Sequence, residues 1–120
     1  MPYDTSLSSE GPVLIVKVKG TFVGPRDKDA IEAKVQELVE QGHTSIILDL
    51  GEVSFLDSSG IGGLIAAFLK ASRKGGSVKL VHVTRRIHEV LQITRLSSVF
   101  EMFDDLQKAL KSFEVDINES

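Results

Sequence analysis

A chain of 120 residues is long enough for one compact domain that buries roughly two-thirds of the surface of its unfolded form. Its net charge of −3 argues against nucleic acid as a direct partner, because phosphate binding relies on clustered lysine and arginine. The lack of cysteine excludes disulfides and thiolate metal sites. No apolar run approaches the roughly 20 residues of a membrane span, and the N-terminus lacks a signal-peptide pattern, so we expect a cytoplasmic protein without membrane contact.

The N-terminal third of the chain predicts two strands followed by a helix. Weak alternation indicates an edge strand over Tyr3–Ser9, and a Gly-Pro turn leads into a second strand over Val13–Val18. We interpret Gly20–Pro25 as a connection. Apolar residues at helical spacing then predict an amphipathic helix from about Asp27 to Gln41, which Gly42 is placed to end.

The middle of the chain predicts a buried strand and a second helix. The isoleucine-rich run Ser45–Leu50 is typical of a central strand buried on both faces. Asp57 is the expected N-cap of the helix that follows, because a short carboxylate can accept hydrogen bonds from the free amides of a first turn. Apolar side chains at helical spacing predict its buried stripe, which comprises Ile61, Leu64, Ile65, Phe68 and Leu69. The opposite face consists of Gly62, Gly63, Ala66, Ala67 and Lys70.

That opposite face carries short side chains, which would allow another backbone to come close. Two successive glycines near a helix start each cost about 1 kcal/mol relative to alanine. Close approach of another backbone would explain why they occur here. We expect this face to be exposed and to bind a partner, and the alternative is that it packs under a neighbouring loop.

The C-terminal part predicts a strand over Val78–Val83, a helix from about Arg86 to Ile93 and a short strand at Val99-Phe100. A final helical stripe comprises Phe103, Leu106, Leu110 and Phe113. We expect the tail from about Glu114 to be frayed. Strands that alternate with helices predict one α/β domain with a mixed, mostly parallel sheet and about four helices.

Ser58 and Ser59 fall in the first turn of the second helix. The unpaired amides and the positive end of the helix dipole favour negative charge there, so a phosphate would be tolerated beside Asp57. An acidic or apolar surface docked on this turn would then be repelled. From the residues alone, the turn is equally well a helix cap without a regulatory role.

The segment Asp57-Ser58-Ser59-Gly60-Ile61-Gly62, with the strand before it, resembles the anti-sigma factor antagonist family, the STAS domain, over roughly the whole chain. The resemblance implies a single STAS domain over residues 1–120 that is a binding switch and not an enzyme. In that family the first serine of the motif is phosphorylated by a serine-protein kinase that is also an anti-sigma factor, and a serine phosphatase reverses the reaction. The unmodified domain sequesters the anti-sigma factor and so frees a sigma factor.

Carried over to this chain, the resemblance implies phosphorylation of Ser58, with Ser59 as the alternative that the residues leave open. The implied partner-binding residues are Asp57, Ser58, Ser59, Gly60, Gly62, Gly63 and Ala66. We expect a monomer or weak dimer without a cofactor. Family members often carry a Gly-x-Leu-Asp-like sequence where this chain has Phe22-Val23-Gly24-Pro25, so the partner contacts of that loop are not carried over.

The same residues bear on several other possible functions. A serine hydrolase is disfavoured because the Gly-x-Ser-x-Gly spacing is missing around Ser58 and Ser59. Nucleotide binding is a weak interpretation, because only the first two glycines of a dinucleotide motif are matched. The three histidines, His43, His82 and His88, share no metal-ligand spacing. A scaffold role in a stress-sensing or transporter-associated assembly remains an alternative, and so does a small-molecule or lipid ligand.

Overall fold

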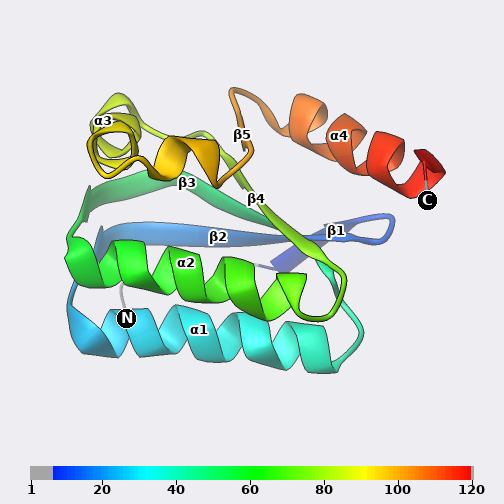
Figure 1. The fold of residues 1–120 in the computed structure, drawn as a ribbon, viewed down its shortest axis with the longest axis horizontal. Coiled ribbons are helices and arrows are strands. Elements are labelled where there is room, and N and C mark those ends of the chain that lie inside the picture. The colour runs from blue at the N-terminus through cyan, green and yellow to red at the C-terminus, as the bar shows by residue number, and fades with distance from the viewer. Residues whose placement is uncertain (1–6, 120) are drawn as a thin grey trace.

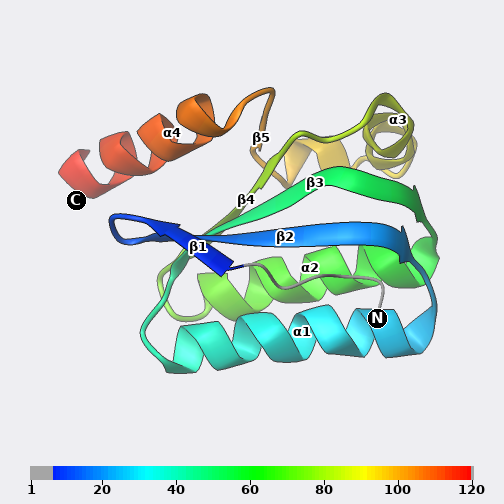
Figure 2. The same ribbon diagram turned by 180° about the vertical axis from the view of Figure 1, so that it is seen from behind.

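The chain forms a five-stranded sheet with helices on both of its faces (Figures 1 and 2). The computed structural model describes residues 7–119. In chain order its elements are β1 (Leu7–Glu10), β2 (Val13–Phe22), α1 (Gly24–Glu40), β3 (Ser45–Leu56), α2 (Ser58–Ser72), β4 (Ser77–Val81), α3 (Arg85–Ile93), a 3₁₀ turn (Leu96–Ser98), β5 (Met102–Phe103) and α4 (Leu106–Glu119). The strand order is β1-β2-β3-β4-β5, with β1 antiparallel to β2 and the other pairs parallel. The predicted mixed, mostly parallel α/β sheet is confirmed.

Strand β3 is the centre of the fold, as its isoleucine run predicts. Ile46, Ile47 and Leu48 are fully buried, because one face of the strand lies under α1 and α2 and the other under α4. The strand is longer than predicted and runs to Leu56, directly before Asp57. Its pairing with β2 also extends to the end, where Phe22 lies opposite Leu56. The ends of β2 and β3, and the helices that follow them, therefore lie side by side.

Two apolar clusters fill the spaces between the sheet and the helices on its two faces. The larger one joins the sheet to α1, α2 and α3, and the smaller one joins it to α4. Alternating side chains of β2 enter different clusters: Val16 and Val18 contribute to the first, and Val13 and Ile15 to the second. The helix layer that carries the predicted site is thus supported by the larger core.

Several predicted boundaries need correction. Gly20–Pro25 is not a free connection, because β2 continues to Phe22 and α1 begins at Gly24, with proline in its first turn. Helix α1 does end as predicted, with Gly42 at a φ of +92° directly after it. The predicted N-terminal strand is found from Leu7 onward, and residues 3–6 lie outside the described part of the chain.

The C-terminal elements are also shifted relative to the prediction. Val99-Phe100 is not a strand, because Phe100 is buried against α2, where its ring meets Phe68 edge to face at 5.7 Å. The strand comes three residues later, where Met102 pairs with Leu80. Helix α4 spans Leu106–Glu119 and so includes the segment from about Glu114, for which fraying stays a prediction. Within the described residues, no helix has both the length and the apolar character that crossing a membrane requires.

Candidate functional site

Asp57 caps helix α2, as the sequence predicts. Its backbone is extended, and its Oδ1 accepts a hydrogen bond from the Gly60 amide at 2.9 Å. The other carboxylate oxygen accepts one from the Gly24 amide at 3.1 Å. Hydrogen bonds to the ionised form, first from Gly60 and then from Gly24, lower the pKa of Asp57 below its usual value, although partial burial opposes them. Asp57 is therefore a fixed negative charge beside the first turn of α2.

The turn before α1 lies against this cap, a contact that sequence reasoning missed. The Asp57 amide donates to the Phe22 carbonyl at 3.4 Å, and the Val23 amide donates to the buried carboxylate of Asp27 at 2.8 Å. Gly24 adopts a φ of +78°, a conformation that favours glycine. Two parallel strands thus end at the same edge of the sheet and start two helices that are hydrogen-bonded to each other there.

The two candidate serines differ in exposure. Ser58 is the first residue of α2 and is exposed, whereas Ser59 is half-buried. A modifying enzyme has to reach a hydroxyl group, so the structure favours Ser58 on access alone. The sequence around the two serines did not distinguish between them.

The predicted orientation of α2 is wrong in part. The line of the helix that is most deeply buried comprises Gly60, Gly63, Leu64, Ala67 and Ala71. Of the expected apolar stripe only Leu64 is fully buried, whereas Leu69 is 42% exposed. The small residues face inward because α1 packs closely there: a Cβ added at Gly63 would lie 2.8 Å from the Ile31 side chain. Close backbone approach was expected, but the neighbour is a helix of the same chain.

This burial changes the set of residues that can meet a partner. A Cβ at Gly60 would lie 2.5 Å from the Phe22 carbonyl oxygen, so Gly60, like Gly63, has a packing role and does not form part of an exposed surface. Gly62 and Ala66 are half-buried and remain candidates for partner contact.

One side of α2 remains open to solvent and begins at Ser58. Residues at helical spacing from it, which we call the outer face of α2, are Ser58, Gly62, Ile65 and Leu69. Ile65 is half-buried and Leu69 is exposed, so the face combines an accessible hydroxyl with apolar surface. This face is the candidate binding surface of the domain.

The arrangement offers little for catalysis. Among the described residues, no hydrogen bond joins the Ser58 or Ser59 side chain to a histidine, and no cluster of three or more His, Cys, Asp or Glu side chains is arranged to hold a metal ion. His82 Nδ1 instead lies 3.1 Å from the Asp49 carboxylate, beyond the end of β4.

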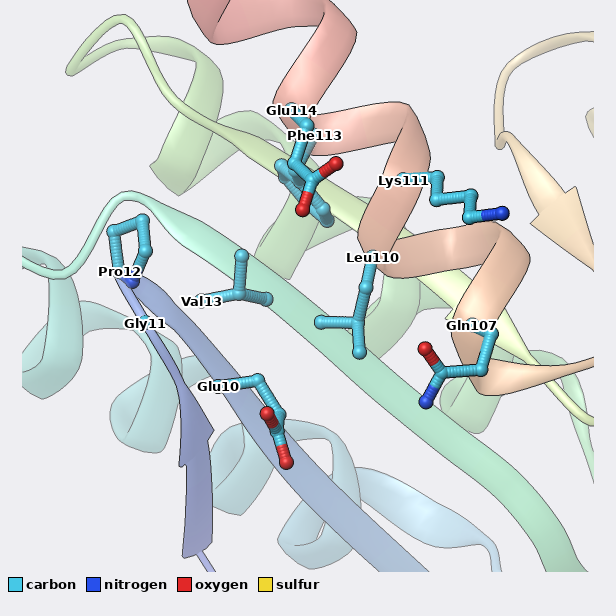
Figure 3. A pocket seen from close by; sticks show the side chains of 9 residues that line it. All are labelled: Glu10, Gly11, Pro12, Val13, Gln107, Leu110, Lys111, Phe113 and Glu114. Atoms are coloured by element: carbon cyan, nitrogen blue, oxygen red, sulfur yellow. The ribbon is translucent and has the colours of Figure 1, made fainter.

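A pocket of about 440 Å³ lies between the β1–β2 turn and α4 (Figure 3). Its lining is mixed, with Val13, Leu110 and Phe113 beside Glu10 and Lys111. It lies at the start of β2, whereas Ser58 follows the end of β3 (Figures 1 and 3). The pocket is therefore separate from the α2 site.

Comparison with known proteins identifies the family. The STAS domain family model matches residues 6–109. A curated relative from Paenibacillus polymyxa, named anti-sigma F factor antagonist, is 27% identical over 104 residues, which cover 86% of this chain and 88% of the relative.

Solved structures agree on the fold. An anti-sigma factor antagonist from Mycobacterium paratuberculosis superposes with a TM-score of 0.78 at 23% identity and covers 91% of this chain and 92% of its own. The Bacillus cell fate determinant SpoIIAA in its phosphorylated form gives a TM-score of 0.69 at 22% identity, over 90% of this chain and 97% of that one.

These findings define a compact α/β domain with the STAS fold. The chain belongs to the STAS domain family, and its curated relatives include anti-sigma factor antagonists.

Proposed function

We propose that this chain is a cytoplasmic anti-sigma factor antagonist that binds an anti-sigma factor through the outer face of α2 and is switched off by phosphorylation of Ser58. The observation that carries the proposal is the exposed Ser58 at the head of an open, partly apolar helix face. The name of the Paenibacillus relative supports the partner class, and a structural neighbour is known in a phosphorylated form. The partner is also the serine-protein kinase that modifies Ser58, and a separate serine phosphatase restores binding.

The switch works by charge. A phosphate adds about −1.5 to −2 charge at neutral pH. It would lie beside Asp57, whose carboxylate is held ionised by its hydrogen bonds, so the two negative charges concentrate at one end of the outer face. A partner that covers this end must either desolvate the phosphate or supply opposing cations.

The position of the charge makes the effect large. A stable protein interface buries about 1,200–2,000 Å² in total, and a few central residues supply most of its affinity. One doubly charged group covered by such an interface can therefore dominate the binding free energy. The protein needs no change of fold to be switched, because Ser58 is exposed and phosphorylation does not have to disrupt the core.

The test is a binding titration of purified anti-sigma factor with paired variants. Ser58→Ala should bind as the unmodified protein does, and Ser58→Asp should bind at least about tenfold more weakly, a difference of about 1.4 kcal/mol. Gln41→Glu is the matched control, because it adds one negative charge on an exposed residue at the far end of α1.

Equal affinities for Ser58→Ala and Ser58→Asp would rule out the switch. Phosphopeptide mapping of the protein from its native cells decides between the two serines, and phosphate on Ser59 alone would move the site by one residue. An unmodified protein with the same partners on both variants would favour the scaffold function.

A further inference from the structure

Lys28 of α1 lies across helix α2 at the position that a side chain of residue 62 would otherwise occupy. A Cβ added at Gly62 would lie 3.2 Å from Lys28 Cε and 3.6 Å from Lys28 Cδ. The end of the lysine stem therefore rests directly on the α2 backbone. Gly62 provides the gap through which the stem passes, which gives this glycine a local reason to lack a side chain.

Gly62 is four residues after Ser58, and both belong to the outer face of α2. Side chains four residues apart on a helix are neighbours, with Cβ atoms about 5–6 Å apart. A side chain at position 62 would lean toward the N-terminus, so the space above Gly62 lies over the turn that carries Ser58. The Lys28 ammonium group, one bond beyond Cε, is therefore within reach of a phosphate on Ser58.

The Lys28 ammonium group is available for such a contact. Within the part of the chain that the structure describes, no hydrogen bond or ion pair engages it. Other lysines of the same helix layer do have carboxylate partners: Lys34 pairs with Glu37 at 3.7 Å, and Lys70 pairs with Glu32 at 3.9 Å. The start of α1 is held against the start of α2 by the Gly24–Asp57 hydrogen bond, so the backbones of Lys28 and Ser58 keep the same relative position.

We propose that Lys28 is the internal counter-ion of the phosphate on Ser58. This inference rests on the modification in the proposed function and adds the residue of this chain that responds to it. The ammonium group favours the doubly ionised phosphate, because opposite charges at short range stabilise each other. Phosphoserine loses its second proton near pH 6, so a nearby cation makes ionisation of the phosphate more complete at neutral pH and favours a position of the phosphate at the start of the outer face of α2.

The test measures the phosphate directly and requires neither kinase nor partner. Phosphoserine is installed at position 58 during translation, and the second ionisation is followed by ³¹P NMR as a function of pH. In Lys28→Met the pKa of the phosphate should rise by about 0.2 to 0.7 pH unit, the size expected when a solvent-exposed ion pair is lost. Lys28→Arg should retain the wild-type titration, because it keeps the positive charge.

Two further variants make the result specific. Lys34→Met removes a lysine of the same helix whose partner is Glu37, and it should leave the phosphate titration unchanged. Gly62→Ala places a methyl group against the lysine stem and should raise the pKa of the phosphate in the same direction as Lys28→Met. Asp57 is present in every variant, so its like charge cancels in the comparison.

An unchanged titration in Lys28→Met, in a protein with wild-type circular dichroism and melting temperature, would overturn the proposal. Its failure can be told apart from failure of the proposed function. A protein that is never phosphorylated in its cells would contradict the switch and leave the NMR result standing, whereas a switch without the Lys28 effect would contradict only this inference.

Discussion

The carboxylate of Asp57 accepts a hydrogen bond from the backbone amide of Gly24 at 3.1 Å, across 33 positions of the chain. The same carboxylate caps α2 through the Gly60 amide. One side chain therefore joins the first turns of two helices that follow neighbouring parallel strands. This link holds the starts of α1 and α2, which carry Lys28 and Ser58, together at one edge of the sheet.

Asp57→Asn should destabilise the protein, and the loss should depend on pH. Hydrogen bonds from Gly60 and Gly24 lower the pKa of the folded-state carboxyl below its unfolded value. A lowered pKa contributes stability that is complete above the unfolded value of about 4 and is lost as pH falls through the folded value. The stability difference between wild type and Asp57→Asn should therefore be largest near neutral pH and shrink below about pH 4.

Urea denaturation at pH 7 and pH 3 measures this difference. Asp29→Asn, which changes an exposed carboxyl of α1, is the control and should have little effect at either pH. A difference for Asp57→Asn that stays constant between the two pH values would show that the charge of Asp57 contributes nothing to the cap.

Gly60→Ala and Gly62→Ala should differ in sign although they lie two residues apart. At Gly60 the new methyl group would meet the Phe22 carbonyl oxygen at 2.5 Å, and a backbone atom cannot easily move. We expect a loss of about 1–3 kcal/mol, the usual cost of overpacking. At Gly62 the neighbour is the mobile end of a lysine, so the gain in helix propensity of up to about 1 kcal/mol should prevail.

Thermal and chemical denaturation of the two variants, side by side, test this contrast. A Gly60→Ala protein as stable as wild type would mean that α2 can move away from β2. The Asp57 cap would then be less rigid than its hydrogen bonds indicate.

What could be predicted from the sequence was local. The Asp57 cap, the Gly42 helix end and the buried β3 run depend on residues close together in the chain, and all three were predicted correctly. The orientation of α2 was not predicted correctly, because either of its faces could pack against the core. One face carries large apolar side chains and the other carries small ones. The face that is buried is determined by contacts with Phe22 and Ile31, which lie on other elements. The periodicity of one helix carries no information about such contacts.

The candidate site was likewise predicted only where its residues are close together in the chain. Ser58 and Asp57 were found because they are adjacent in a motif, whereas Gly24 and Lys28 precede them by about thirty residues and carry no motif of their own. Their roles come from the pairing of β2 with β3, which brings the two helix starts together. A prediction that parallel neighbouring strands end at one edge could have directed attention to the Gly24–Lys28 segment.

Lys79→Ala should destabilise the contact between the sheet and α4. Lys79 is 1% exposed, and its ammonium group lies 2.9 Å from Ser112 Oγ and 4.3 Å from the centre of the Phe113 ring. Removal of its buried stem leaves a cavity, which typically costs about 2–4 kcal/mol. Lys79→Met keeps most of the volume and should cost less than about 1.5 kcal/mol, since Glu101, the carboxylate partner of Lys79, is mostly exposed and stays solvated.

The free energy of unfolding of both variants checks this, with near-ultraviolet circular dichroism as a probe of the Phe113 environment. Equal losses for Lys79→Ala and Lys79→Met would show that the charge of Lys79, and not its stem, stabilises the docking of α4.

Leu69→Ser should weaken binding of the anti-sigma factor at a modest cost in stability. Leu69 is 42% exposed at the far end of the outer face of α2, so its replacement should lower the free energy of unfolding by only about 1 kcal/mol. Loss of an apolar side chain that anchors an interface reduces binding by more than about 1 kcal/mol, or about fivefold in Kd. Ile93→Ser on α3 is the matched control: Ile93 is 82% exposed, and it lies on a different helix from Ser58. Titration calorimetry with both variants locates the interface. A loss confined to Ile93→Ser would place the partner on α3, and the charge of a Ser58 phosphate would then have to act on binding from outside the contact surface.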